Sequence, residues 1–258
     1  MNSAENFHLV VVIDLPHYIR FLTQHLCIFI YSSKMKPTNW KILLENILND
    51  NKDKTKNIFN VSVGTIENNR PRVRTMVHRG FAKDSNYLLT TTDIRMDKVK
   101  QFENTYVNDL GSPVEYVFWI ETALRQFRIS ANAFLLPSPN YTSPTPFSEK
   151  LKNSGIDFEN ERVRIYNEMS SALRSSFAKP FAPGSIRHAN QDTSSYPSEV
   201  DINYDDKWYK LGLDHFVLVV LDPIQIDYVD LETLPNIRRI YKRVEDVDDK
   251  WSEEDVHP

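Results

Sequence analysis

Two neighbouring stretches decide the fold of this chain: Pro-Arg-Val-Arg-Thr-Met-Val-His-Arg-Gly-Phe over residues 71–81, and Leu-Leu-Thr-Thr-Thr-Asp-Ile-Arg-Met-Asp-Lys over residues 88–98. The first stretch alternates branched and cationic residues, and the second is rich in branched residues, as in half-buried strands. The polar residues Lys83-Asp84-Ser85-Asn86 between them are typical of a turn. The two stretches therefore predict an antiparallel hairpin with strands at residues 73–81 and 87–92.

The segments on either side of this hairpin predict further strands and a few helices. A strand at residues 58–66 precedes it, joined by turn residues 67–71, and an amphipathic helix at residues 37–50 begins at an Asn39 cap. The other expected elements are helices at residues 98–106 and 161–177, and strands at residues 114–120, 126–136, 215–221, 224–231 and 238–244. Asp222-Pro223 is expected to separate two of these strands. The pattern predicts a mainly β (α+β) fold, an antiparallel barrel with flanking helices, rather than a parallel doubly wound sheet.

The chain is expected to consist of an N-terminal extension, residues 1–36, and one domain, residues 37–258. Within the domain, residues 185–207 are polar and nearly free of large apolar side chains, which favours a flexible surface excursion. Residues 9–31 are rich in apolar side chains, but charged residues and a proline interrupt them, and a spanning helix needs about 20 apolar residues. We therefore expect no membrane segment. The absence of a basic leader and the lone Cys27 favour a cytoplasmic location.

Composition and motifs argue against several classes of function. A formal net charge of −4 does not suit a protein that coats nucleic acid, whereas 41% hydrophobic and 26% charged residues are ordinary for a globular protein. The chain has six glycines and no Gly-Xaa-Gly-Xaa-Xaa-Gly or phosphate-loop sequence, so a Rossmann-type site is not expected. Its histidines lack metal-ligand spacing, and no Gly-Xaa-Ser-Xaa-Gly elbow is present. We expect neither a metal nor a nucleic-acid partner.

The hairpin over residues 71–98 resembles the flavin-binding hairpin of the pyridoxamine 5′-phosphate oxidase-like split-barrel family. Two further blocks follow in the order and spacing of that family, Phe118-Trp119-Ile120-Glu121 and Arg125-Gln126-Phe127-Arg128-Ile129. Later matches at residues 161–166, 170–177, 183–184, 220–223 and 226–231 resemble a less characterised branch of the family more than the vitamin-B6 oxidase itself. The resemblance implies a split β-barrel that binds flavin mononucleotide (FMN).

The resemblance also implies roles for individual residues. Cations and hydroxyls on short, rigid strands suit the FMN phosphate, which carries close to two negative charges at pH 7. By position, Arg74 and Lys98 would hold the phosphate, with a hydroxyl from Thr91 or Thr92. Backbone groups of Thr75, Met76 and Val77 would edge the flavin ring, Gln126 would donate to the ring or the ribityl chain, and Arg79 would stand where the oxidase has a lysine that reaches the flavin and the substrate.

The chain departs from the family pattern at several positions. Met96 replaces a serine, Asp97 replaces an arginine that contacts the phosphate in the oxidase, and Ala131 stands where glycine is common. The substrate-reading run of the oxidase is absent, with residues 219–227 in its place, so no catalytic residue is assigned. We expect these changes to weaken FMN binding and to leave the substrate open.

The expected protein is an FMN-dependent oxidoreductase that forms a homodimer with FMN at the subunit interface and acts on an unknown small molecule. A non-catalytic flavin carrier or sensor is the alternative, and a pocket for pyridoxal phosphate or another aromatic phosphate is a third. Individual residues have alternatives too. The arginines of residues 70–79 also fit a solvated strand face, and His78 fits either a flavin-tuning group or a packing residue.

Overall fold

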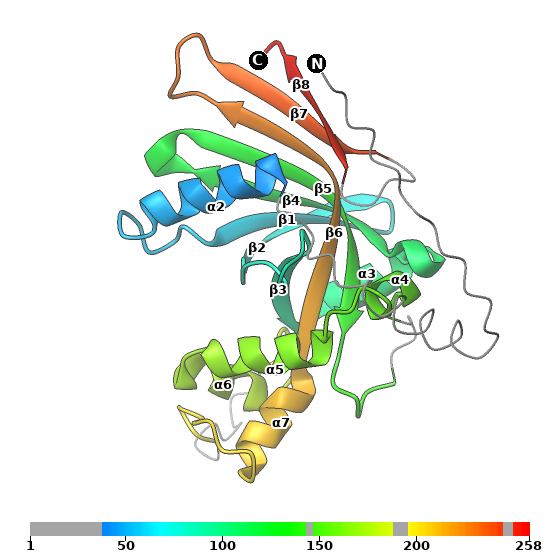
Figure 1. Cartoon of the computed structure of the whole chain (residues 1–258). Helices are drawn as coiled ribbons and strands as arrows, with labels where there is room; N and C mark the ends of the chain where they lie inside the picture. Colours follow the sequence, from blue (N-terminus) through cyan, green and yellow to red (C-terminus); the bar gives the residue numbers. More distant parts are fainter. Residues whose placement is uncertain (1–37, 143–146, 188–195, 245–249) are drawn as a thin grey trace, which may run out of the picture. The chain divides into compact units, whose positions relative to one another are not determined.

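The computed structural model describes residues 38–142, 147–187, 196–244 and 250–258, so the predicted N-terminal extension lies outside the described residues. Eight strands form one antiparallel sheet in the order β2-β1-β4-β5-β6-β7-β8, and β3 pairs with β6 (Figure 1). The strands are β1 (Asn60–Glu67), β2 (Arg70–Val77), β3 (Leu88–Asp93), β4 (Ser112–Ile120), β5 (Arg125–Leu136), β6 (Phe216–Asp230), β7 (Ile237–Arg243) and β8 (Trp251–Val256). The helices of the described part are α2 (Asn39–Asn51), α3 (Asp97–Thr105), α4 (Glu149–Lys152), α5 (Phe158–Glu168), α6 (Ser171–Ala178) and α7 (Lys207–His215). The predicted mainly antiparallel fold with flanking helices is confirmed.

The β1–β2 hairpin forms because its turn residues accept an unusual backbone conformation. Asn68 and Asn69 have φ angles of 51° and 59°, the left-handed region that asparagine tolerates better than most residues and that two-residue hairpins require. Pro71 lies in β2, which is an edge strand of the sheet path, so its missing N–H breaks no ladder between two strands.

Strand β6 organises the sheet because it pairs with three neighbours. Its first half, Phe216–Leu221, pairs with β3, its second half, Gln225–Asp230, pairs with β7, and β5 runs along nearly its whole length. The sheet is not closed into a continuous ladder. The residues that follow β2 are joined to the start of β3 by two backbone hydrogen bonds. Arg79 N donates to Leu89 O at 2.8 Å, and Leu89 N donates to Gly80 O at 2.9 Å.

The two strands predicted at residues 215–221 and 224–231 are one continuous strand, so Asp222-Pro223 does not end it. The register between β5 and β6 shifts at Ser130/Ala131, where Pro223 faces Ala131. A β-bulge of this kind accommodates a residue that cannot donate to the ladder. Proline therefore marks an irregularity in β6 rather than its end.

Helix boundaries differ from the predictions at two places. The predicted helix at residues 161–177 is two helices, since the Ser170 hydroxyl accepts a hydrogen bond from Leu173 N and begins α6 after α5 has ended. The first helix is capped by the backbone of Thr38, one residue before the predicted Asn39. Helices α4 and α7 and strand β8 were not predicted.

Two hydrophobic cores lie on the two faces of β6. Alternate residues Val217, Val219 and Leu221 belong to a core shared with α2, β1, β4 and β5, whereas Leu218 and Val220 belong to a core formed with helices α4–α7. All five side chains are fully buried. The first half of β6 is therefore a shared layer between the sheet core and the helical core.

Part of the predicted excursion at residues 185–207 lies against helix α6. Val200 is buried, its N–H donates to Ser171 O, and the Ser175 hydroxyl donates to Pro197 O. Residues 188–195 lie outside the described residues, and the flexibility of the excursion stays a prediction. Within the described ranges no helix has the length and apolar character to span a membrane, and no cluster of His, Cys, Asp and Glu side chains is suited to a metal ion.

Candidate functional site

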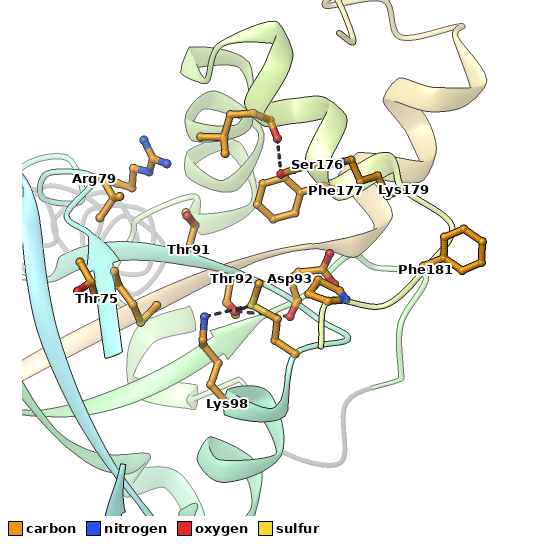
Figure 2. Close-up of a pocket in the computed structure, with 15 residues that line it drawn as sticks. Thr75, Arg79, Thr91, Thr92, Asp93, Lys98, Ser176, Phe177, Lys179 and Phe181 are labelled. Atoms are coloured by element: carbon orange, nitrogen blue, oxygen red, sulfur yellow. Dashed lines mark hydrogen bonds between the residues drawn. The ribbon is translucent and has the colours of Figure 1, made fainter. Parts of the chain in front are cut away.

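A pocket of about 550 Å³ lies beside β2, the β3–α3 junction and the end of α6 (Figure 2). Seven of the nine residues predicted to contact FMN or substrate line it: Thr75, Met76, Val77, Arg79, Thr91, Thr92 and Lys98. The other lining residues are Asp93, Met96, Leu173, Ser176, Phe177, Lys179, Phe181 and Pro183. The two stretches that decide the fold, residues 71–81 and 88–98, therefore supply nine of the fifteen lining residues.

The edge of strand β2 forms one side of the pocket. Over residues 70–77 the strand pairs with β1 alone, so about half of its backbone N–H and C=O groups point away from the sheet. The Thr90 hydroxyl donates to Val77 O at 2.8 Å and ties this edge to β3. Unpaired backbone donors and acceptors of this kind can bind the polar edge of a flat heterocycle.

A methionine sulfur lies between the cation and the hydroxyl at the phosphate end of the predicted site. Lys98 Nζ is 3.1 Å and Thr92 Oγ1 is 3.6 Å from Met96 Sδ (Figure 2). Burial lowers the pKa of Lys98, the nearby charge of Arg74 lowers it further, and Asp93 opposes both effects. Within the described ranges Lys98 has no carboxylate ion pair, so its ammonium group is available to an anion.

Arg79 presents a donor that the described part of the protein leaves unused. Its Nε is buried and has no hydrogen-bond partner among the described residues. Burial lowers the pKa of Arg79, but a guanidinium group stays charged in proteins. Arg79 lines the pocket, where its positive charge can act on an anionic ligand. Together with Lys98, this donor fits a ligand that carries a phosphate and further acceptors, as FMN does.

Arg74 and Gln126 do not line the pocket. The Arg74 guanidinium donates to Val63 O at 3.2 Å, to Thr65 Oγ1 at 2.6 Å and to Gln101 Oε1, although its charge still affects the pKa of Lys98. Gln126 lies on the same outer sheet face as Thr75, but on β5, separated from β2 by β1 and β4. Three strand spacings correspond to about 14 Å. Within one chain, these two residues are therefore outside the immediate site.

His78 is a packing residue in this structure. Its ring contacts the rings of Phe81, Tyr116 and Phe118, and its Nδ1 lies 3.3 Å from Tyr116 Oη. Burial lowers the pKa of His78 to about 3, so the imidazole is neutral at pH 7. It does not line the pocket.

The sequence did not assign the second wall of the pocket, formed by α6 and the segment after it. This wall combines apolar side chains such as Phe177 and Phe181 with the Ser176 hydroxyl and the Lys179 ammonium group (Figure 2). The resemblance noted at residues 170–177 and 183–184 was the available signal, but it named no role for these residues. Only the folded structure, in which they line the same pocket as β2 and β3, identifies them as pocket residues.

The chain has an antiparallel fold of the split-barrel type, with a pocket suited to a flat ligand that carries a phosphate. Residues 37–137 match the family model described as pyridoxamine 5′-phosphate oxidase, FMN-binding domain, which confirms the resemblance and FMN as the cofactor. A curated relative, pyridoxine/pyridoxamine 5′-phosphate oxidase 2 of Arabidopsis thaliana, is 23% identical over 220 residues, which are 85% of this chain and 96% of the relative.

Two solved structures are similar over most of the chain. One is a pyridoxamine 5′-phosphate oxidase-related, FMN-binding protein from Nostoc punctiforme, with 26% identity and a TM-score of 0.65 over 87% of this chain and 100% of that chain. The other is PhzG from Burkholderia lata in complex with tetrahydrophenazine-1-carboxylic acid, with 13% identity and a TM-score of 0.57 over 88% of this chain and 96% of that chain. The second likeness bears on the fold alone.

Proposed function

We propose that this protein is a homodimeric FMN-dependent oxidoreductase related to pyridoxamine 5′-phosphate oxidase. The observation that carries the proposal is the pocket, where seven residues assigned from the sequence lie together and the Arg79 donor has no partner within the described ranges. Lys98 and Thr92 would bind the phosphate, and the free edge of β2 would bind the ring. FMN, when bound, accepts and returns electrons, while the chain orients it and tunes its surrounding charge.

Arg79 and the named relative indicate which substrates to test first. We assign Arg79 to stabilising negative charge, on the reduced flavin or on a substrate phosphate, because it is a cation that lines the pocket shortly after Thr75, Met76 and Val77 of β2. The relative from Arabidopsis thaliana is named for pyridoxine and pyridoxamine 5′-phosphates, and both belong in the first substrate screen. No catalytic acid or base is assigned.

A homodimer with FMN at its interface is supported by the outer face of β2, β1, β4 and β5. Val73 and Trp119 on this face are 70% and 49% exposed, which is unusual for large apolar side chains on a strand surface. Thr75 and Val77 lie on the same face and also line the pocket. A second copy packed there would bring its own Gln126 towards the pocket. We also propose a cytoplasmic location, supported by the single cysteine.

The test begins with an absorption spectrum of the full chain after FMN addition and desalting, with size-exclusion chromatography on the same sample. Flavin bands at about one FMN per subunit of a dimer support the site and the assembly. Pyridoxamine and pyridoxine 5′-phosphates and other amine or alcohol donors are then tested for anaerobic bleaching of the flavin. A wild-type protein that retains no FMN overturns the proposal. An Arg79→Ala variant with unchanged FMN affinity and turnover overturns the role assigned to Arg79.

A flavin carrier or sensor without turnover is the second candidate. It is favoured by the lack of the substrate-reading run of the oxidase, in whose place residues 219–227 stand. Tight FMN binding with no bleaching by any donor supports this candidate. Bleaching by a defined donor, followed by reoxidation in air, excludes it.

A further inference from the structure

The two walls of the pocket come from segments that are far apart in the sequence. Thr91, Thr92 and Lys98 belong to β3 and α3, whereas Phe177 and Lys179 belong to the end of α6. A helix leaves its last carbonyl groups without intrahelical donors, and α6 is followed by Pro180, which cannot continue it. Some other group has to satisfy these carbonyls and hold the second wall.

Arg95, in the turn between β3 and α3, provides those donors. Its Nη1 donates to Lys179 O at 2.6 Å and its Nη2 to Phe177 O at 3.3 Å. The same guanidinium binds the carboxylate of Asp93 through Nε and Nη2, at 2.9 and 2.6 Å. The Asp93 side chain is only 3% exposed, so this ion pair is held in place by burial on one side. A cation at a helix C-terminus also complements the helix dipole.

His215 strengthens the same connection from the end of α7. Its Nδ1 donates to Phe177 O at 2.8 Å, and its backbone carbonyl accepts from Ile94 N at 2.8 Å. The carbonyl of Phe177 thus receives two donors, one from the β3–α3 turn and one from α7. Both walls of the pocket are tied to one turn by hydrogen bonds rather than by apolar contact alone.

We propose that Arg95 is a positioning residue of the cofactor site, which holds the α6 wall against the β3–α3 wall through the carbonyls of Phe177 and Lys179. Arg95 is not among the lining residues, so it acts through the segment it binds. The inference rests on the proposed FMN site. It makes a distinct claim: the wall, and with it the retention of FMN, depends on a fork-shaped donor and not on charge alone.

A different role for Arg95 would give a different result. If Arg95 left Asp93 and bound the FMN phosphate directly, replacing the cation that is missing at Asp97, its removal would reduce the preference for FMN over riboflavin. If Arg95 only holds the wall, both flavins lose affinity by the same factor. The ratio of the two dissociation constants therefore separates positioning from phosphate binding.

The experiment compares Arg95→Lys, which keeps the charge but loses the fork, with the double variant Asp93→Asn/Arg95→Gln, which leaves no unpaired buried charge. The control is Arg72→Lys, since Arg72 makes an exposed ion pair with Glu67 at 2.7 Å outside the pocket. For each full-length protein, amide exchange of residues 177–187, the FMN dissociation rate, and the dissociation constants of FMN and riboflavin are measured.

We expect two rates to rise about tenfold or more over wild type in both Arg95→Lys and the double variant: amide exchange at residues 177–187 and FMN release. This is the effect of losing a charge-assisted hydrogen bond. The ratio of the FMN and riboflavin dissociation constants stays at the wild-type value. Unchanged exchange in a folded Arg95→Lys protein, or a loss of FMN preference, overturns the inference. If the wild-type protein binds no FMN, the proposed function fails, but amide exchange still decides whether Arg95 holds the wall.

Discussion

Lys98 is a pocket cation that the structure leaves open to an anion, since within the described ranges its ammonium group has a hydrogen-bond partner only in a thioether. For Lys98→Ala we expect the FMN dissociation constant to rise roughly tenfold to a hundredfold, as for loss of one charge-assisted hydrogen bond. Riboflavin, which lacks the phosphate, should bind almost as before. Fluorescence titration measures both, with Lys100→Ala on the exposed side of α3 as the control. Equal losses for the two flavins would contradict this role.

Met96 lies beside Lys98 and Thr92, where we propose that the FMN phosphate binds, and offers it no hydroxyl donor. A single substitution can test this. Met96→Ser restores a hydroxyl beside Lys98 and should tighten FMN about fivefold, equivalent to about 1 kcal/mol for one hydrogen bond. Because Met96 also occupies the N-cap position of α3, where serine is favoured, the melting temperature of the protein without FMN should rise as well. A rise in melting temperature without a change in FMN affinity would mean that position 96 does not contact the phosphate.

His78 should make stability depend on pH because the folded protein holds it neutral. Its pKa is lowered to about 3, against about 6.5 in an unfolded chain. Between these values the unfolded chain binds more protons, so the free energy of unfolding is highest above pH 6.5 and falls as pH falls towards 3. The loss from pH 7 to pH 5 is about 2 kcal/mol for this group. In urea unfolding, His78→Phe should lose less of its free energy of unfolding between pH 7 and pH 5 than wild type does. The control His257→Gln, at an exposed histidine, should lose as much as wild type.

At the level of elements, the helical layer depends on a close approach between α7 and α5. A Cβ atom at Gly212 would lie 2.2 Å from Tyr166 Oη. We expect Gly212→Ala to lower the free energy of unfolding by about 1–3 kcal/mol through overpacking, despite a helix propensity gain of up to about 1 kcal/mol. The Tyr166→Phe/Gly212→Ala double variant, without the hydroxyl, should recover part of this loss in urea unfolding. A fully additive double variant would show that the contact is not the cause.

Elements with a strong local pattern could be predicted from the sequence. The hairpin of β1 and β2 has alternating residues and a turn of two asparagines, so each local preference agrees with the fold. Strand β8 could not be predicted, because three of the six residues in its sequence Trp-Ser-Glu-Glu-Asp-Val are acidic. It forms by pairing with β7, where Arg239 makes ion pairs with Glu253 and Asp255 at 2.9 and 2.7 Å. Pairing between distant segments is not encoded in a local pattern.

The candidate site divides in the same way. Seven of its predicted residues lie on one hairpin and on the start of α3, so local spacing was enough to bring them together. The wall formed by Phe177 and Lys179 depends on hydrogen bonds to Arg95, a residue more than 80 positions earlier in the chain. Such a contact is invisible in one sequence. Its physical cause, the unsatisfied carbonyls at the end of α6, appears only once the helix has its neighbours.

At the level of the whole molecule, the proposed dimer makes a prediction about shared sites. If Gln126 reaches FMN from the second subunit, Lys98→Ala and Gln126→Ala homodimers are both defective. A mixed dimer then has one site with both changes and one intact site. Unfolding and refolding the two variants together should therefore restore tight binding of about one FMN per mixed dimer, measured by titration. No recovery in verified hybrids would place Gln126 in its own subunit's site, whereas a Gln126→Ala homodimer with normal FMN affinity would place Gln126 outside the site.

The pairing of β3 also fixes when the pocket can exist. Asp93 of β3 pairs with Phe216 of β6, more than one hundred residues further along the chain, and the helical wall needs the end of α7 as well. Contacts between segments so distant form slowly, because a long loop has to close before they contribute. During synthesis the hairpin with the proposed phosphate-binding residues leaves the ribosome before β6, so β3 cannot yet pair with β6. A growing chain therefore acquires this pocket only after β6 has been synthesised, more than one hundred residues after the hairpin, and flavin can bind only to a chain that already contains both.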